Sequence, residues 1–143
     1  MDYAPHRIAE ILGLPVGATV PRSILVLEDA IRRGFPKSAL YNVSRAIEDD
    51  PGRANELAYS VVPKSTLNRR DVLTPEQSER TERLARLFAH AEQVFGDRAD
   101  ARTFIHRPHP ELDGRSPLEV AAMELGARRV EQVLNALEFG LPV

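Results

Sequence analysis

Helical periodicity is the feature that most limits how this 143-residue chain can fold. Along almost its whole length, apolar residues recur three and four positions apart, the spacing that places side chains on one face of an α-helix. Glycines and prolines separate these segments, and no segment shows the sustained apolar–polar alternation of a half-buried strand. The sequence therefore predicts an all-α fold, a bundle of helices.

Two helix starts are marked by the same capping pattern. Thr74-Pro75-Glu76-Gln77 and Ser116-Pro117-Leu118-Glu119 each place a hydroxyl residue at the N-cap, proline at the first helical position and Gln or Glu at the third. The first start opens the longest expected helix, which ends at Gly96. The second opens a helix that we expect to bury Leu118, Ala121, Ala122 and Leu125 and to end at Gly126. A last helix is expected to end near Gly140.

Shorter helices are expected in the first half of the chain. Their boundaries follow from the apolar spacing and from glycine or proline at the ends. The expected helices cover residues 5–12, 23–33 and 36–47, followed by two short helices within residues 53–70 that are hinged at Val62-Pro63, and later a helix through residues 101–105.

Composition excludes several classes of protein. The chain has no cysteine, which excludes a disulfide scaffold, a thiol nucleophile and a zinc site built on sulfur. No apolar run approaches the roughly 20 residues that span a bilayer, and the N-terminal residues lack the pattern of a signal peptide. We therefore expect a cytoplasmic protein without a membrane partner. The net charge of −2 gives no global basic field.

Basic charge is concentrated in one short segment. Residues 61–70 carry 3 basic and no acidic side chains, whereas residues 71–143 carry 9 basic and 13 acidic ones. The two short helices around this segment have the layout of a helix-turn-helix, in which the second helix enters the major groove of DNA. The alternative is a solvated helix end whose basic residues complement the helix dipole. The candidate DNA-binding residues are Lys64, Ser65, Thr66, Asn68, Arg69 and Arg70.

Catalytic and metal-binding motifs are not recognisable in this sequence. His106 and His109 lie three positions apart, but Pro108 breaks the helix that would align them. The motifs of a serine hydrolase, a phosphate-binding loop, a dinucleotide-binding fold and a zinc protease do not occur. We expect no catalytic residue, no metal site and no cofactor, and hence a protein that is not an enzyme.

Several segments, taken in their order and spacing, resemble one known family. They are similar to the toxin-binding C-terminal region, and to the Xre-like helix-turn-helix, of the Xre/MbcA/ParS antitoxins. The similar segments are residues 62–70, 73–76, 104–110, 114–119, 126–130 and 134–140.

The resemblance implies a type II antitoxin. Such proteins neutralise a RES-domain toxin, and RES toxins act on NAD, by degrading it or by ADP-ribosylating a target protein. It also implies that residues 1–72 form an Xre-like helix-turn-helix region that makes a homodimer and binds promoter DNA, and that residues 73–143 form a toxin-binding domain. The toxin-facing residues carried over are Arg115, Arg128, Glu131, Leu134, Glu138, Phe139, Gly140, Leu141, Pro142 and Val143.

Two functional hypotheses follow. In the first, the last helix and the tail occlude the toxin's substrate cleft, and Glu138 or the carboxylate of Val143 pairs with an arginine in the NAD pocket. In the second, the chain is a plain helix-turn-helix repressor, and its C-terminal half serves only for oligomerisation. The tail is docked on a partner in the first hypothesis and frayed in the second.

Overall fold

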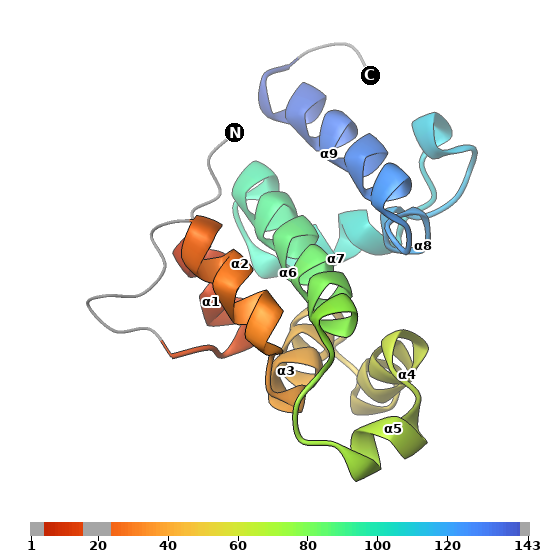
Figure 1. The fold of residues 1–143 in the computed structure, drawn as a ribbon. Helices are drawn as coiled ribbons and strands as arrows, with labels where there is room; N and C mark the ends of the chain where they lie inside the picture. Colours follow the sequence, from red (N-terminus) through yellow and green to blue (C-terminus); the bar gives the residue numbers. More distant parts are fainter. Residues whose placement is uncertain (1–4, 16–23, 141–143) are drawn as a thin grey trace. The chain divides into compact units, whose positions relative to one another are not determined.

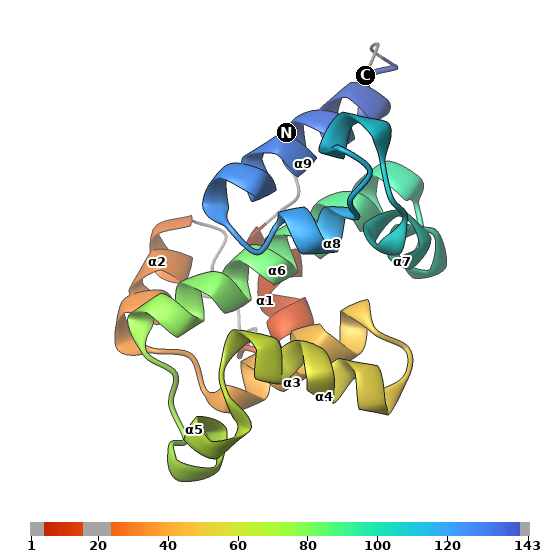
Figure 2. The ribbon, with the colours of Figure 1, turned by 90° about the vertical axis from the view of Figure 1, so that its right-hand side faces the viewer.

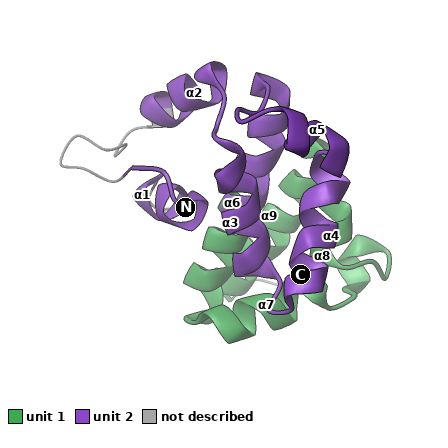
Figure 3. Cartoon of the chain, turned by 90° about the horizontal axis from the view of Figure 1, so that it is seen from below, with its two compact units in different colours: residues 1–3, 86–143 green, residues 4–85 purple. Residues whose placement is uncertain are grey.

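The computed structural model describes residues 5–15 and 24–140, and these residues confirm the all-α prediction (Figure 1). They form α-helices, one short 3-10 helix and no strand. The chain divides into two compact units, residues 4–85 and residues 86–143 (Figure 3). The longest helix, α6 (Pro75–Phe95), contributes its first half to the N-terminal unit and its second half to the C-terminal unit.

The N-terminal unit is built around α3. This helix packs against α1 on one side and α4 on the other (Figure 2), and it buries Leu40, Val43 and Ile47 completely. The expected helices are therefore confirmed here, with boundaries that differ by one or two residues. The helices of this unit before α6 are α1 (Pro5–Leu12), α2 (Ile24–Arg33), α3 (Lys37–Ile47), α4 (Pro51–Val61) and α5 (Lys64–Arg69).

The boundary between the compact units lies later than the expected boundary between residues 72 and 73. The segment before α6 is bonded to the segment before α3, since the amide of Leu73 donates to the carbonyl of Phe35 at 2.8 Å. The amide of Phe35 in turn donates to the hydroxyl of Ser78, within α6, also at 2.8 Å. These bonds join the start of α6 to the N-terminal unit, so the division falls between Ala85 and Arg86.

Both predicted capping boxes are formed. The amide of Gln77 donates to the Thr74 hydroxyl at 3.1 Å, and the Gln77 side chain accepts from the amide of Thr74 at 3.0 Å. Ser116 and Glu119 make the same reciprocal pair at 3.2 Å in each direction. Each box satisfies backbone donors that a helix start would otherwise leave without a partner.

The C-terminal unit continues from α6 with short elements and one long helix. Its central short helix, α8, packs against both α7 and α9, and α9 also contacts the 3-10 helix. The elements after α6 are α7 (Arg98–His106), the 3-10 helix η1 (Pro110–Leu112), α8 (Pro117–Val120) and α9 (Glu124–Glu138).

The expectation for the helix that starts at Ser116 was wrong. The helix ends at Val120 instead of reaching Gly126, and Gly126 lies in the first turn of α9. A side chain at this position would overlap the backbone carbonyl of Val120. Glycine is therefore used for the close approach of α9 to α8 rather than as a helix stop. Of the residues expected to be buried, Ala121 is buried, Leu118 is half-buried, and Ala122 and Leu125 are exposed.

The end of the last helix agrees with the expectation. Helix α9 ends at Glu138, and Gly140 adopts a left-handed conformation with φ of 66°, a backbone region that favours glycine after a helix. Residues 141–143 lie outside the described residues.

Candidate DNA-binding and toxin-binding surfaces

The tight turn at Val62-Pro63 joins α4 to α5. Val62 is buried, and the carbonyl of Pro63 accepts from the amides of Thr66 and Leu67 at the start of α5. Leu67 is buried as well, and its carbonyl accepts from the Lys37 ammonium group at 2.9 Å. The short helix is therefore held by one apolar anchor and one charged donor, and its remaining side chains are available to solvent.

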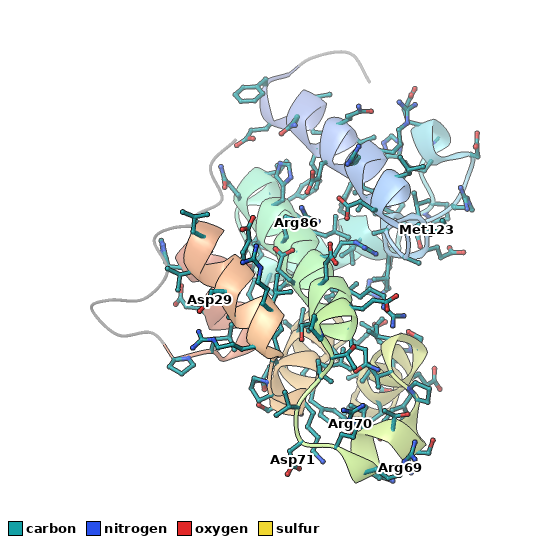
Figure 4. The ribbon with its side chains drawn as sticks, viewed as in Figure 1. Asp29, Arg69, Arg70, Asp71, Arg86 and Met123 are labelled. Carbon is teal, nitrogen blue, oxygen red and sulfur yellow. The ribbon has the colours of Figure 1, made fainter. Side chains whose placement is uncertain are left out.

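The predicted DNA-binding residues lie on this short helix and directly after it. All of them are exposed except Thr66, which is half-buried. The Lys64 ammonium group lies 5.8 Å from the centroid of the Tyr59 ring, and the Arg69 side chain donates to the carbonyl of Ser65 at 3.3 Å. Figure 4 shows Arg69 and Arg70 around the end of α5. The structure thus brings three cations onto one solvated helix.

Asp71 follows these cations directly and would repel a phosphate. Its carboxylate lies 3.7 Å from the Lys37 ammonium group, and its side chain is 97% exposed. An ion pair this exposed is weak. It nevertheless places Lys37, a fourth cation, next to Asp71, the acidic residue that follows the three cations. Sequence reasoning missed Lys37, because nothing in the local pattern of α3 indicates that it reaches residues 67 and 71.

Leu125, Gln132 and Phe139 form a row along the exposed side of α9, which we call the outer face. These residues are spaced seven apart, so they share one side of the helix. Leu125 is 74% exposed and Phe139 is 65% exposed. The guanidinium groups of Arg128 and Arg129 flank this row and are exposed. The Arg129 guanidinium group pairs with the Glu111 carboxylate at 3.0 Å. The outer face therefore combines large apolar side chains with arginines in exposed ion pairs.

Leu125 was not among the predicted toxin-facing residues, and neither was Met123, which is 71% exposed directly before α9 (Figure 4). The sequence contained a signal for Leu125, since it lies two heptads before Phe139. This signal was hidden by the expectation that Gly126 ends a helix in which Leu125 is buried.

Leu134 has to be removed from the toxin-facing set. It is completely buried, together with Val130 and Ala127 on the same side of α9. That side lies opposite the row of Leu125 and Phe139, so Leu134 belongs to the core of the C-terminal unit.

Glu131 and Glu138 face α6 rather than the outer side. A Glu131 carboxylate oxygen lies 3.5 Å from the Arg86 side chain, and Glu138 accepts from the Gln93 amide at 3.0 Å. Both glutamates are half-buried. The expected pairing of Glu138 with an arginine of the toxin would have to compete with this internal hydrogen bond.

The other predicted toxin-facing residues that the structure describes are exposed. Arg115 ends a tight turn in which Asp113 and Gly114 both have positive φ, and its amide donates to Leu112 at 3.1 Å. Arg128 lies 3.9 Å from Glu124, one helical turn earlier. Gly140 is exposed. Leu141, Pro142 and Val143 lie outside the described residues.

Among the described residues, Glu119, Tyr41 and His90 have shifted pKa values, and none of these three belongs to a catalytic arrangement. Hydrogen bonds from Ser116 lower the pKa of the capping residue Glu119. Burial, with a contribution from Tyr59, raises the pKa of Tyr41. Burial also lowers the pKa of His90, an effect that the Glu138 carboxylate opposes.

The histidines near the 3-10 helix have structural roles. The ring of His109 accepts from the amide of Glu111 at 3.1 Å and so caps the 3-10 helix. The His106 ring contacts the carbonyl of Arg102 at 2.7 Å. Across residues 5–15 and 24–140, no three His, Asp or Glu side chains are grouped so that they could hold a metal ion.

Comparisons with known proteins assign a function to each unit. The model of the antitoxin Xre-like helix-turn-helix domain matches residues 26–86, and the model of the antitoxin Xre/MbcA/ParS C-terminal toxin-binding domain matches residues 90–140. The two matches meet inside α6, close to the division between the compact units. The chain is therefore a DNA-binding type II antitoxin whose partners are a toxin and DNA, a class of regulators rather than of enzymes.

Similar curated proteins extend over almost the whole chain. Antitoxin Xre of Pseudomonas putida is 32% identical over 134 residues, which cover 94% of this chain and 82% of that protein. Antitoxin Xre of Yersinia enterocolitica is 31% identical over 121 residues, covering 81% and 80% of the two chains. The chain belongs to the Xre/MbcA/ParS antitoxin family. None of its described helices combines the length and the apolar character needed to cross a bilayer.

Proposed function

We propose that this antitoxin neutralises a RES-domain toxin that acts on NAD, by covering the toxin's substrate cleft with the outer face of α9 and the tail of residues 139–143. The observation that carries the proposal is the exposure of Leu125 and Phe139 within the segment matched by the toxin-binding model. Large exposed apolar side chains on one face are typical of a protein-binding surface. We expect the inhibition of the toxin to take place in the cytoplasm, where NAD and promoter DNA occur together.

The charges on the outer face refine the electrostatic part of this proposal. Two half-buried glutamates of α9, Glu131 and Glu138, are paired inside the unit with Arg86 and Gln93. The guanidinium groups of Arg128 and Arg129 lie on the outer face, where they pair with Glu124 at 3.9 Å and with Glu111 at 3.0 Å. Both ion pairs are exposed and therefore weak, so an acidic partner can compete for these arginines. We therefore expect an acidic rim on the toxin opposite these arginines, which would accelerate association and set the orientation of the complex.

The affinity of variants for the purified RES-domain toxin tests this surface. Burying one large apolar side chain contributes roughly 1.5–3 kcal/mol, so Leu125→Ala and Phe139→Ala are each expected to raise Kd about tenfold or more. Deleting residues 139–143 is expected to weaken inhibition far more than it lowers the free energy of unfolding. Val72→Ala, an exposed apolar residue of the N-terminal unit, is the matched control. Unchanged affinity in all three variants would contradict the proposal.

We also propose that α5 binds the promoter of the antitoxin's own operon. This proposal is supported by the helix-turn-helix model over residues 26–86 and by the exposure of Lys64, Arg69 and Arg70. Short polar side chains at the start of the same helix suit contacts to base edges, and the arginines after it suit phosphates. In this reading the chain represses its operon and inhibits its toxin through different units.

A homodimer formed through α2 completes the proposal. The exposed side of α2 carries Leu25 and Val26 near its start, and Asp29, Arg32 and Arg33 further along. Two antiparallel copies related by a two-fold axis would place the carboxylates of one helix near the guanidinium groups of the other. The mass of the chain in solution, measured by sedimentation, is expected to be that of a dimer, and Leu25→Glu is expected to give a monomer. A monomeric wild-type chain at micromolar concentration would rule this out.

A further inference from the structure

Between α9 and the second half of α6 lies a row of polar side chains, which we call the polar seam. On α6 it consists of Arg86, His90 and Gln93, and on α9 of Glu131, Asn135 and Glu138. Arg86 pairs with Glu131 at 3.5 Å, and Gln93 donates to Glu138 at 3.0 Å. The seam therefore has polar groups from both helices at each of its ends.

The spacing of the seam is the same on both helices. Each helix contributes residues at positions i, i+4 and i+7, so the two rows match when the helices run side by side in the same direction. Arg86, labelled in Figure 4, pairs in addition with Glu124 at 3.6 Å. Glu124 lies one heptad before Glu131. Arg86 thus lies between two carboxylates of α9, and its position along that helix is defined from both sides.

His90 occupies the centre of the seam and is completely buried. Burial lowers the pKa of its ring, and the Glu138 carboxylate acts in the opposite direction. A neutral imidazole at this position removes the cost of burying a second cation near Arg86. Apolar contacts are made on other sides of α9, where Val130 and Leu134 are buried.

Polar pairs between helices specify register at some cost in stability. Apolar side chains pack in several registers with similar energies, whereas a part-buried charged group such as Arg86 or Glu131 pays its desolvation cost when it loses its partner in the wrong register. Gln93 is exposed and adds only its hydrogen bond to Glu138. Sliding α9 by one turn, about 5.4 Å, would separate Arg86 from Glu131 and Gln93 from Glu138 at the same time. The register of α9 also decides where the outer face lies.

We propose that the polar seam fixes the register of α9 along α6 and that Arg86, Gln93, Glu131 and Glu138 are therefore positioning residues for toxin binding. The role of these residues in the register rests on the ion pairs of Arg86 and on the hydrogen bond between Gln93 and Glu138. Their role in toxin binding rests on the proposed function. Glu131 and Glu138 then influence inhibition without touching the toxin, in contrast to the role that the sequence resemblance implied for them.

An apolar replacement of the Arg86–Glu131 ion pair separates positioning from mere stabilisation. The variant Arg86→Met with Glu131→Leu keeps the volume of the seam, and replacing a part-buried ion pair by apolar groups is often neutral or stabilising. We expect its urea midpoint to equal or exceed that of the wild type, while its inhibition of the RES-domain toxin falls about tenfold or more. Arg98→Met with Glu92→Leu removes an ion pair of similar length, 3.5 Å, that does not involve α9, and it is expected to inhibit normally.

The absence of cysteine allows the register to be measured without the toxin. Spin labels at two exposed sites of the C-terminal unit, Ala99→Cys and Gln132→Cys, report the position of α9 along its axis. We expect one narrow distance distribution in the wild-type background, and a broadened or shifted one in the Arg86→Met, Glu131→Leu background. An unchanged distribution overturns the register role, whether or not the toxin is bound. If the distance distribution changes while inhibition of the toxin does not, the seam fixes the register of α9 but the register does not influence toxin binding, which overturns the second part of the proposal.

Discussion

Gly126 shows how one residue can mislead a sequence-based boundary. A glycine between two apolar-periodic segments commonly ends a helix, and here it lies inside one because α9 approaches the Val120 carbonyl closely. Whether a glycine serves as a stop or as a point of contact depends on its spatial neighbours, which local sequence does not contain. The same error placed Leu125 in the core. Leu134, in contrast, was carried over from the resemblance as toxin-facing, although its spacing from Val130 follows the buried side of the helix.

Gly126→Ala is expected to destabilise the chain. The added methyl group would overlap a backbone carbonyl that cannot rotate away, and overpacking of this kind costs roughly 1–3 kcal/mol. Urea unfolding measures the effect. Gly52→Ala, in the first turn of α4, is the control, because its added methyl group meets only the side chain of Asp50. It should change the free energy of unfolding by less than about 1 kcal/mol. Equal effects at the two sites would contradict the close approach.

Stability is expected to fall on mild acidification because of His90. The folded chain holds the pKa of this ring below its ordinary value of 6.5, so the unfolded chain binds the proton first as the pH falls. The contribution of His90 to the free energy of unfolding is therefore fully present above about pH 6.5. It decreases below that pH until the ring is protonated in the folded state as well. Urea midpoints across this range measure the slope. In His90→Gln the slope should be smaller, and an identical slope would show that other groups cause it.

At the scale of helices, the sequence predicted most starts and ends correctly, since capping is a local interaction. Both boxes, at Thr74 and Ser116, form as their residue types require. The polar seam was not predictable in the same way. Its residues belong to two helices far apart in the sequence, and Glu131 and Glu138 on a helix surface look like solvated charges until a partner is known. The pairing of Lys37 with Asp71 was missed for the same reason.

Helix α5 yields a prediction about DNA. Arg69→Gln and Arg70→Gln are each expected to weaken binding of the promoter across all sequences tested. Each change should also reduce the slope of log K against log salt by about 0.9, the value for one lost phosphate contact. Fluorescence anisotropy at several salt concentrations measures both quantities. Arg107→Gln, an exposed arginine of the C-terminal unit, controls for net charge. Equal slopes in the three variants would place the DNA elsewhere.

At the scale of the whole molecule, a helix-turn-helix unit and a toxin-binding unit share the single helix α6. The sequence predicted two regions in this order. The resemblance implied a boundary between residues 72 and 73, whereas the bonds from Phe35 to Leu73 and Ser78 extend the first compact unit into the helix. The toxin-facing residues carried over from the resemblance stay a prediction, since periodicity gives the side of a helix but not which side is covered by a partner.

The most direct test of the central claim is NAD consumption by the toxin that we propose as the partner, a RES-domain protein encoded beside this gene, measured with increasing amounts of the antitoxin. We predict that NAD loss stops near an equimolar ratio. NAD loss that continues at full rate in the presence of excess antitoxin, while the same preparation still shifts its promoter DNA, would contradict inhibition and leave a repressor alone.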